Sequence, residues 1–309
     1  NQLPASKAQR IFNQIEDAID DFDVQNGDTL YIEGSTDAYD GAVLTKRLVI
    51  IGTGYFLGEN GGVQIGNSTS RLNEGIRFRA GSEGSFVYGV SVSGFPSFDF
   101  EVNNIVVENC YMSNFSYNAG VKDIEIRKCY INSFAPSGPS SGATNFIFKN
   151  NIARLFSGGF GSTTLIFSEF SNNTIHTNKN VFIRANVFRN NILITEQAVN
   201  IDLVATVNEF NLATFGQFGT ENNNRNMDLG EMVADPSFQT GSTDGRYRLK
   251  EGSIYKNAGK DGVEPGAFGG PNPYRLSGTP PIPNITELET TGIGTQADGL
   301  PVTIKVRSF

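Results

Sequence analysis

Apolar and polar residues alternate in a short phrase that recurs through the middle of the chain. Between residues 104 and 212 the phrase takes the forms VVENCYM, EIRKCYI, FIFKNNIA, EFSNNTI and VFRNNIL. The copies follow one another at intervals of about 20 residues, and a repeat of this length is the signature of a solenoid. The pattern therefore predicts one elongated, repetitive architecture rather than two ordinary globular domains.

Equivalent positions of the five copies form columns of similar residues. One column holds cysteine or asparagine, at Cys110, Cys129, Asn151, Asn173 and Asn191. An apolar column stands three residues earlier, at Val107, Ile126, Phe148, Phe170 and Phe188. Free cysteine is among the most buried residue types, and asparagine tolerates tight bends. We expect the cysteine and asparagine column to face inward and its amides to bond from one turn to the next, as an asparagine ladder.

The content of each copy indicates strands. Residues 124–127 and 146–149 alternate between apolar and polar side chains, as half-buried strands do. No copy contains ten residues of helical periodicity or the repeated leucines of a leucine-rich repeat. Short strands that turn at asparagine, glycine and serine favour an all-β coil.

The phrase N-N-x-I/L resembles the repeats of one known group of proteins. It occurs at residues 150–152, 172–175 and 190–193. Through it, residues 27–270 resemble the right-handed parallel β-helix proteins of the pectin-lyase-like superfamily, and the segment I-I-G-x-G at residues 50–54 resembles the entry of many secreted bacterial members. The resemblance implies a right-handed parallel β-helix, which we expect to have about ten turns, and a secreted or cell-surface location.

Both ends of the solenoid need a cap, because an open end exposes apolar side chains and unpaired strand edges. Residues 6–22 carry an apolar helical face, with Ser6 and Gln9 in capping-box spacing. We therefore expect a capping helix within residues 1–26, a β-helix over residues 27–270, and a proline-rich linker with terminal strands over residues 271–309. Residues 302–307 alternate, with residues 285–290 as their antiparallel mate. We expect this tail to fold back on the β-helix; the alternative is that it pairs with another surface protein.

Composition narrows the choice of partners. A net charge of −8 argues against nucleic acid and against an anionic membrane, which select basic surfaces. The chain has no run of 18 apolar residues, so no membrane span is expected. The two cysteines are too few for a disulfide scaffold, and on neighbouring turns we expect them to be free buried thiols.

One set of outward positions suggests catalysis. Strand alternation places Glu125 and Glu169 on the outer face two turns apart, a separation of about 9.6 Å at the usual strand spacing. Inverting glycosidases hold two carboxylates about 6.5–9.5 Å apart, and Arg127 and Lys149 between them could bind an acidic polysaccharide. The competing interpretation is simple ion pairing on an exposed sheet face.

Comparison with the motifs of the resembled superfamily weakens the catalytic hypothesis. The polygalacturonase motifs N-T-D, D-D, G-H-G and R-I-K do not occur in the repeats at residues 104–212, where the chain has Asn173-Thr174-Ile175 instead of N-T-D. The only histidine, His176, is expected in a turn or at the surface. Calcium-dependent pectate lyases need clustered acidic ligands, whereas Asp123 is the only aspartate between residues 103 and 200. We expect no metal site and no cofactor.

Aromatic residues outside the apolar column suggest ligand binding instead. Phe95, Phe98 and Phe100, beside Asp99 and Glu101, are expected in an exposed loop, and Tyr117, Phe134 and Phe160 in turns between strands. Aromatic rings can stack on sugar faces, although such rings are also often buried under their own loop. The leading hypothesis is a glycan-binding β-helix protein without a catalytic centre, with Phe98, Asp99, Glu101 and Tyr117 as ligand-binding residues. A polysaccharide lyase or inverting hydrolase, and a structural adhesin or spacer, are the alternatives.

Overall fold

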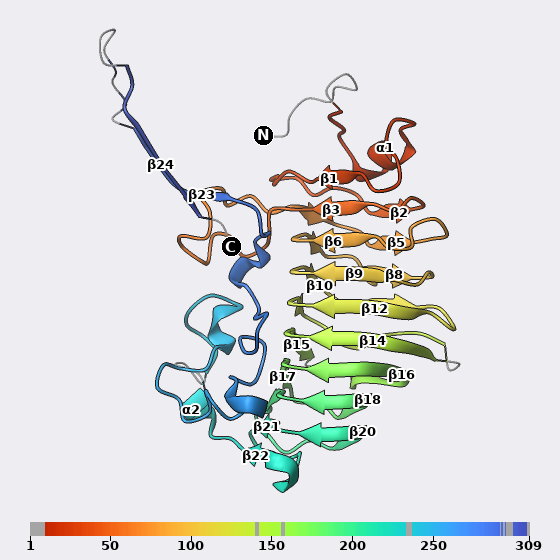
Figure 1. Ribbon diagram of the computed structural model, residues 1–309, viewed down its shortest axis with the longest axis vertical. Helices are drawn as coiled ribbons and strands as arrows, with labels where there is room; N and C mark the ends of the chain where they lie inside the picture. The colour runs from red at the N-terminus through yellow and green to blue at the C-terminus, as the bar shows by residue number, and fades with distance from the viewer. Residues whose placement is uncertain are drawn as a thin grey trace.

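The chain forms a parallel β-helix whose strands lie in three sheets along a common axis (Figure 1). The computed structural model describes residues 10–139, 142–155, 158–232, 237–290, 292, 294 and 299–307. Strands of successive turns pair in parallel and in register, so each sheet grows by one strand per turn. The predicted all-β solenoid is confirmed. The two long sheets have nine strands each in the described part of the chain, against the expected ten or so turns.

The sheets are named here by their strands. Sheet 1 consists of β1 (Thr29–Tyr31), β3 (Val49–Ile51), β6 (Phe86–Tyr88), β9 (Ile105–Glu108), β12 (Lys122–Arg127), β14 (Ala143–Lys149), β16 (Phe160–Ser171), β18 (Val181–Arg189) and β20 (Ile201–Glu209). Sheet 2 consists of β4 (Arg71–Leu72), β7 (Ser91–Val92), β10 (Tyr111–Met112), β13 (Tyr130–Ile131), β15 (Ile152–Leu155), β17 (Thr174–Thr177), β19 (Ile192–Ile194), β21 (Leu212–Ala213) and β22 (Arg225–Asn226). Sheet 3 consists of β2 (Ala42–Leu44), β5 (Ile76–Phe78), β8 (Phe98–Phe100) and β11 (Phe115–Tyr117).

The asparagine ladder runs at the bend between sheets 1 and 2. The Oδ1 atom of Asn173 accepts a bond from the backbone N–H of Asn151 at 2.9 Å, and the Oδ1 atom of Asn191 accepts one from Asn173 at 3.0 Å. The ladder continues through Asn211 and Asn224, which lie outside the recurring phrase. The successive buried bends from Asn151 to Asn224 are therefore joined by hydrogen bonds between neighbouring turns.

The interior is filled by the predicted apolar column. Phe148, Phe170 and Phe188 are fully buried, and their rings stack at centroid distances of 4.8 and 5.4 Å. Burying such a side chain contributes about 1.5–3 kcal/mol, so the column is a main source of stability. Cys110 and Cys129 are free and buried on neighbouring turns, as predicted.

The N-terminal cap is shorter than expected. Helix α1 (Ile15–Asp20) packs its buried Ile15, Ala18 and Ile19 against the first turns, while Ser6 and Gln9 lie outside the described residues. The prediction that the helix reaches Phe22 is wrong, because Phe22 lies beyond it and is 87% exposed. The Nζ atom of Lys46 donates to the carbonyl oxygen of Ile19 in the last turn of the helix and to those of Asp21 and Val24 just after it. Lys46 thus ties the end of the helix to the chain that follows.

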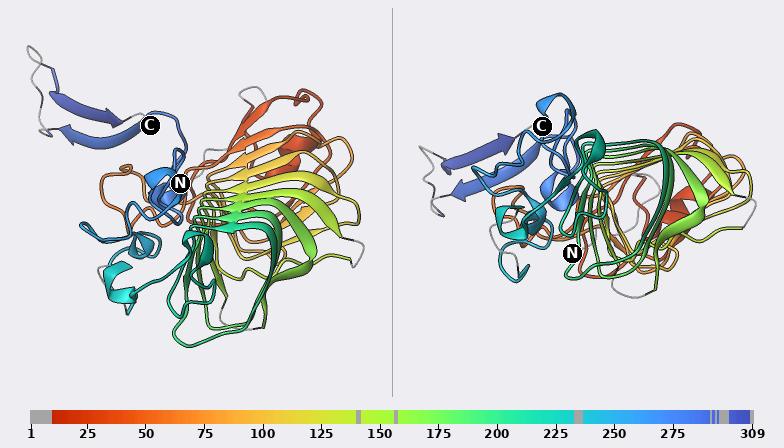
Figure 2. Two further views of the ribbon diagram at one scale, coloured as in Figure 1. Left: turned by 60° about the horizontal axis from the view of Figure 1, so that its bottom comes forward. Right: turned by 90° about the horizontal axis from the view of Figure 1, so that it is seen from below.

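After β22 and the short helix α2 (Leu229–Met232), the chain returns along the outer face of sheet 2. Residues 237–283, here called the return segment, contain the 3-10 turns η3 (Gly245–Tyr247), η4 (Lys260–Gly262) and η5 (Leu276–Gly278). The return segment therefore lies along the side of the β-helix (Figure 2). A second apolar core lies between sheet 2 and the return segment. Sheet 2 contributes Tyr130, Ile152, Ile192 and Leu212, and the return segment contributes Phe238, Tyr247, Leu249 and Ala267.

The chain ends in a two-stranded antiparallel hairpin, β23 (Asn284–Thr290) and β24 (Val302–Arg307), here called the C-terminal hairpin. The predicted strand pair is therefore confirmed. The hairpin projects away from the β-helix (Figures 1 and 2), and Leu288, Ile304 and Val306 are more than half exposed. The expectation that these strands fold back on the β-helix is wrong: the start of β23 is hydrogen-bonded to the loop of residues 52–70, and from there both strands lead away from the β-helix.

Candidate functional site

The four residues predicted to be catalytic lie together on the outer face of sheet 1. Parallel pairing places Arg127 beside Glu108 on one side and Lys149 on the other. Ile147 separates Glu125 from Glu169 in the next column, so the predicted register is correct. The sequence therefore located this group of side chains.

Both carboxylates of this group are ion-paired. Glu125 Oε1 lies 2.7 Å from Arg127 Nη1, and Glu169 Oε2 lies 2.6 Å from Lys149 Nζ. Ser171 Oγ donates to the other oxygen of Glu169 at 2.7 Å. A carboxylate held by its own cation is poorly placed to exchange protons with a substrate. The catalytic role stays a prediction, and the geometry favours a charged ladder that stabilises the sheet.

Glu108 is the most enclosed member of this ladder. It is only 6% exposed and binds Arg127 Nε at 2.7 Å and Lys128 Nζ at 2.9 Å. Burial lowers the pKa of the Arg127 guanidinium, but the Glu108 carboxylate outweighs this effect, so the pKa is raised overall. Glu108, Arg127 and Lys128 therefore form a partly buried charge cluster.

The predicted exposed aromatic loop is wrong for Phe98 and Phe100, whereas Phe95 lies in the bend before β8 and is 72% exposed, as expected. Phe98 and Phe100 belong to β8 and point into the core, where both are fully buried, and Tyr117 in β11 is 2% exposed. Phe134 is also buried, and the side chain of Phe160 lies outside the described residues. The alternation of Phe98, Asp99 and Phe100 is that of a strand with its aromatic face inward. Buried rings offer no face to a sugar.

Asp99 and Glu101 point outward from sheet 3 and share one cation. Arg79 binds Asp99 at 3.0 Å through Nη2 and Glu101 at 2.9 Å through Nε. Ser116 Oγ also donates to Asp99, at 2.5 Å. These acidic side chains stabilise neighbouring turns, and Phe98 and Tyr117, the two rings predicted to bind a ligand with them, are buried.

A better candidate lies on the outer face of sheet 2, in the first turns. A cavity of about 360 Å³, here called the sheet 2 cleft, opens between β4, β7 and β10 and the loop of residues 52–70. Its lining combines aromatic rings, hydroxyl and amide groups and one cation: Ser35, Thr36, Tyr55, Phe56, Asn67, Ser68, Thr69, Arg71, Ser91 and Tyr111. No carboxylate belongs to this described lining.

Strand register explains where the cleft lies. One outward column of sheet 2 runs through Arg71, Ser91, Tyr111, Tyr130 and Ile152. The return segment packs on this column from Tyr130 onwards, whereas Arg71 is exposed and Tyr111 is half-buried. The cleft is therefore the part of the column that the return segment leaves uncovered.

Aromatic rings form the wall of the cleft. Tyr111 stacks on Tyr130 at 5.8 Å, with the ring planes 10° apart, and meets the edge of Phe56 at 5.6 Å. The hydroxyl of Tyr130 accepts a bond from Arg154 Nη1 at 2.8 Å, which fixes the inner ring of the stack. Burial raises the pKa of Tyr111, so its hydroxyl stays a neutral donor at physiological pH. The wall is thus preorganised.

The loop of residues 52–70 contacts residues 32–34 on one side and the return segment on the other. Thr53 N donates to Ser70 Oγ at 2.9 Å, and Ser70 Oγ donates to the carbonyl of Ile32 at 2.6 Å. Gly34 faces the Ser68 carbonyl so closely that an added Cβ would lie 2.0 Å from that oxygen. Ser277 Oγ of the return segment donates to the Phe56 carbonyl at 3.1 Å. The sequence alone did not reveal this site because separate stretches of the chain build it, at residues 35–36, 55–56, 67–71, 91 and 111.

Arg71 supplies positive charge to the cleft. Its side chain is exposed, and Nη2 donates to the carbonyl of Thr36 at 3.3 Å, a neutral acceptor. A guanidinium offers several donors in a plane, which suits carboxylate or sulfate groups. The cleft can therefore present aromatic faces and a cation to the same ligand.

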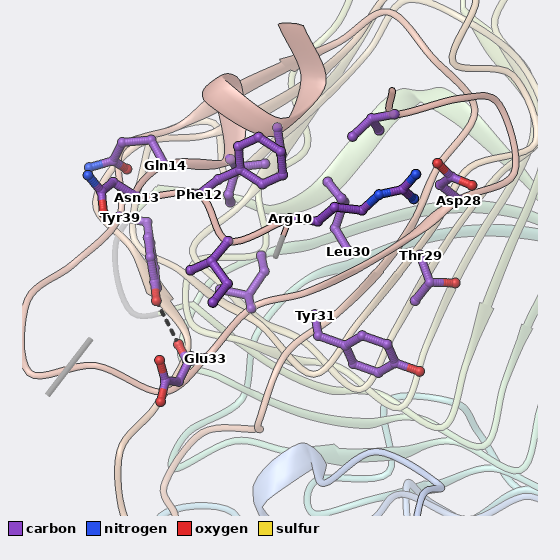
Figure 3. Close-up of a pocket in the computed structure, with 15 residues that line it drawn as sticks. Arg10, Phe12, Asn13, Gln14, Asp28, Thr29, Leu30, Tyr31, Glu33 and Tyr39 are labelled. Atoms are coloured by element: carbon purple, nitrogen blue, oxygen red, sulfur yellow. Dashed lines mark hydrogen bonds between the residues drawn. The ribbon is translucent and has the colours of Figure 1, made fainter. Parts of the chain in front are cut away.

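Two other cavities have different linings. One of about 380 Å³ lies between α1 and β1 and is largely apolar, with Phe12, Leu30 and Tyr31 around it (Figure 3). There the Tyr39 hydroxyl donates to the Glu33 carbonyl at 3.1 Å. This cavity lies at the N-terminal end of the β-helix, where the stacked core ends. Another, of about 460 Å³, lies beside β19 and β21 and includes Glu196, Phe215 and Asp228.

His176 lies in β17 and is buried, so the expectation of a turn or surface residue is wrong. Its Nδ1 atom lies 3.0 Å from the Tyr247 hydroxyl, and its ring packs on Phe238 at 4.6 Å. Burial, and to a lesser extent Arg154, lowers its pKa to about 4. His176 therefore fastens the return segment to sheet 2 in its neutral form.

A lowered histidine pKa makes stability depend on pH. The neutral ring is favoured in the folded state, so its stabilisation is complete above pH 6.5 and is lost as the pH falls towards about 4. The loss expected for this shift is about 3 kcal/mol. Urea unfolding of the wild type and of His176→Gln at pH 7 and pH 4.5 measures this loss of unfolding free energy. The carboxylates contribute equally to both proteins, so the difference between the two pH dependences is due to His176. An identical pH dependence in the two proteins would contradict the assignment.

Within the described residues, no cluster of three or more histidine, cysteine or acidic side chains is arranged to hold a metal ion. Among the helices described, none has the length and apolar character needed to cross a bilayer. Comparison with protein-family models, with curated proteins and with solved structures finds no match to this chain.

Proposed function

We propose that the protein binds a carbohydrate in the sheet 2 cleft and that Arg71 contacts an acidic group of that ligand. The observation that carries the proposal is the lining: Phe56 and Tyr111 offer aromatic faces, serine, threonine and asparagine offer hydrogen bonds, and Arg71 is the one charged residue of the described lining. Aromatic bodies with a few placed polar groups are typical of small-ligand sites.

In this proposal the protein binds the carbohydrate and does not cleave it. The acidic pair Glu125 and Glu169 lies on sheet 1, away from the cleft, and each carboxylate is neutralised by its neighbour. Kinship with the pectin-lyase-like superfamily, and a secreted or cell-surface location where polysaccharides are met, belong to the same proposal and rest on the N-N-x-I/L phrases.

The proposal is tested by calorimetry with neutral and uronic-acid oligosaccharides chosen from a glycan array. Tyr111→Ala should weaken binding of both kinds by at least about tenfold, which is about 1.4 kcal/mol. Arg71→Ala should weaken only the acidic ligands, and added salt should reduce the difference.

Matched controls exist on sheet 3 and on its adjoining turn. Arg77→Ala removes an exposed arginine, and Phe95→Ala removes an aromatic ring that is 72% exposed. Both variants should bind like the wild type. If no oligosaccharide binds, or if the cleft variants and the control variants lose affinity equally, the proposal fails. Release of reducing ends or unsaturated products from a bound ligand would show turnover instead.

A further inference from the structure

The C-terminal hairpin has one apolar and one polar face. Its cross-strand pairs Ile285–Val306, Leu288–Ile304 and Thr290–Val302 lie on one face, because residues opposite each other in a ladder point the same way. The pairs Asn284–Arg307, Glu287–Lys305 and Glu289–Thr303 lie on the other. Lys305 Nζ binds Glu287 Oε2 at 2.7 Å on the polar face.

The apolar face is uncovered. Its five aliphatic side chains are Ile285, Leu288, Val302, Ile304 and Val306, each between 46% and 58% exposed. A backbone hydrogen bond from Ile65 N to the Ile285 carbonyl, at 2.9 Å, ties the base of the hairpin to the loop of residues 52–70. Beyond that point the two strands extend away from the β-helix (Figure 1). An isolated two-stranded ribbon is only marginally stable in water, so this one needs a second layer.

We propose that the second layer is the same face of another copy of this chain, so that two hairpins stack face to face in a two-fold symmetric dimer. The face is self-complementary, because its ladder pairs are aliphatic apart from Thr290 and none is charged. A two-fold axis brings identical patches together without the open-ended growth of a head-to-tail contact.

The exposed area of the face suits this occupant. Complete burial of its five aliphatic side chains, each about half exposed, removes roughly 500 Å² per copy, close to the roughly 1,000 Å² in total that marks a specific interface. Each chain carries a net charge of −8, so the two bodies repel each other, whereas the stacked faces carry no charge. Because the contact itself is uncharged, salt should strengthen the dimer by screening repulsion between the two bodies.

Sedimentation velocity of the full chain tests the inference. The wild type should dimerise at micromolar concentration, and more tightly at high salt than at low salt. Ile304→Asp places a charge on the apolar face and should give a monomer. Thr303→Lys also places a charge on the same strand, but on the polar face and opposite Glu289, and should leave the dimer unchanged. Wild-type protein that stays monomeric, or equal effects of the two variants, would overturn the proposal.

A second variant separates loss of the interface from loss of the hairpin. Leu288→Thr combined with Ile304→Thr removes apolar surface while keeping residues that favour strands. It should weaken dimerisation at least tenfold. A dimer of unchanged strength would show that this face is not the contact, and association that weakens with salt would indicate an oppositely charged partner surface instead. The inference is independent of the sheet 2 cleft, because none of these residues lines it.

Discussion

Asn173→Ala is expected to lower the free energy of unfolding by about 3–6 kcal/mol. The Asn173 side chain accepts bonds from Asn151 N at 2.9 Å and from Asn151 Nδ2 at 3.1 Å, and it donates to the Phe148 carbonyl at 2.9 Å. All these partners are buried, so each would lose a hydrogen bond that water cannot replace. A buried polar group without a partner costs about 1–3 kcal/mol.

Urea denaturation followed by circular dichroism measures this loss. Asn180→Ala is the matched control, because Asn180 lies in the same turn but is exposed. It should change stability by less than about 0.5 kcal/mol. Equal stabilities of the two variants would mean that the ladder adds little beyond the stacked phenylalanines.

Asp244→Ala is expected to cost about 3–5 kcal/mol and to release the return segment from the loop of residues 52–70. Asp244 is fully buried and accepts bonds from Asn60 Nδ2 at 2.9 Å, from Ser277 N at 2.7 Å and from the Tyr274 hydroxyl at 3.2 Å. The Tyr274 and Tyr55 hydroxyls also lie 2.7 Å apart. Burial raises the pKa of Tyr274, so it remains a donor.

Hydrogen exchange and thermal unfolding detect this change. Amides of the return segment, such as Ser277 N, should lose protection before those of β14 and β16. Asp20→Ala, which removes an exposed carboxylate in α1, should have little effect. Because Phe56 is held by Ser277, Asp244→Ala should also weaken any ligand binding in the sheet 2 cleft. Full protection in the variant would contradict this role for Asp244.

The sequence predicted the parts of the fold that repeat locally. Strand register across Ile126, Phe148 and Phe170 follows from the spacing of the recurring phrase, and the buried amides follow from the asparagine column. Sheet 3 was missed because its strands occupy only four turns and carry no common phrase. Phe98 and Phe100 were therefore assigned to an exposed loop although their alternation is that of a strand.

The candidate site depends on contacts that no short stretch of sequence encodes. The hydroxyls of Tyr55 and Tyr274 are hydrogen-bonded although the two residues are 219 positions apart in the sequence. Arg71 lines the cleft only because β4 pairs with β7. The same holds for His176, whose burial is due to Phe238 and Tyr247. Local patterns predicted which residues of sheet 2 point outward, but not which of them the return segment would cover.

The path of the return segment has a consequence for folding. Repeat proteins in which each turn touches only its neighbours can fray from either end, one turn at a time. Here the last part of the chain is bound to Asn190, Thr174 and Asn150 in succession, and then to Tyr55 near the first turns. Contacts between residues so far apart in sequence slow folding. They also couple the two ends, so the molecule should melt in a single cooperative transition although its architecture is linear.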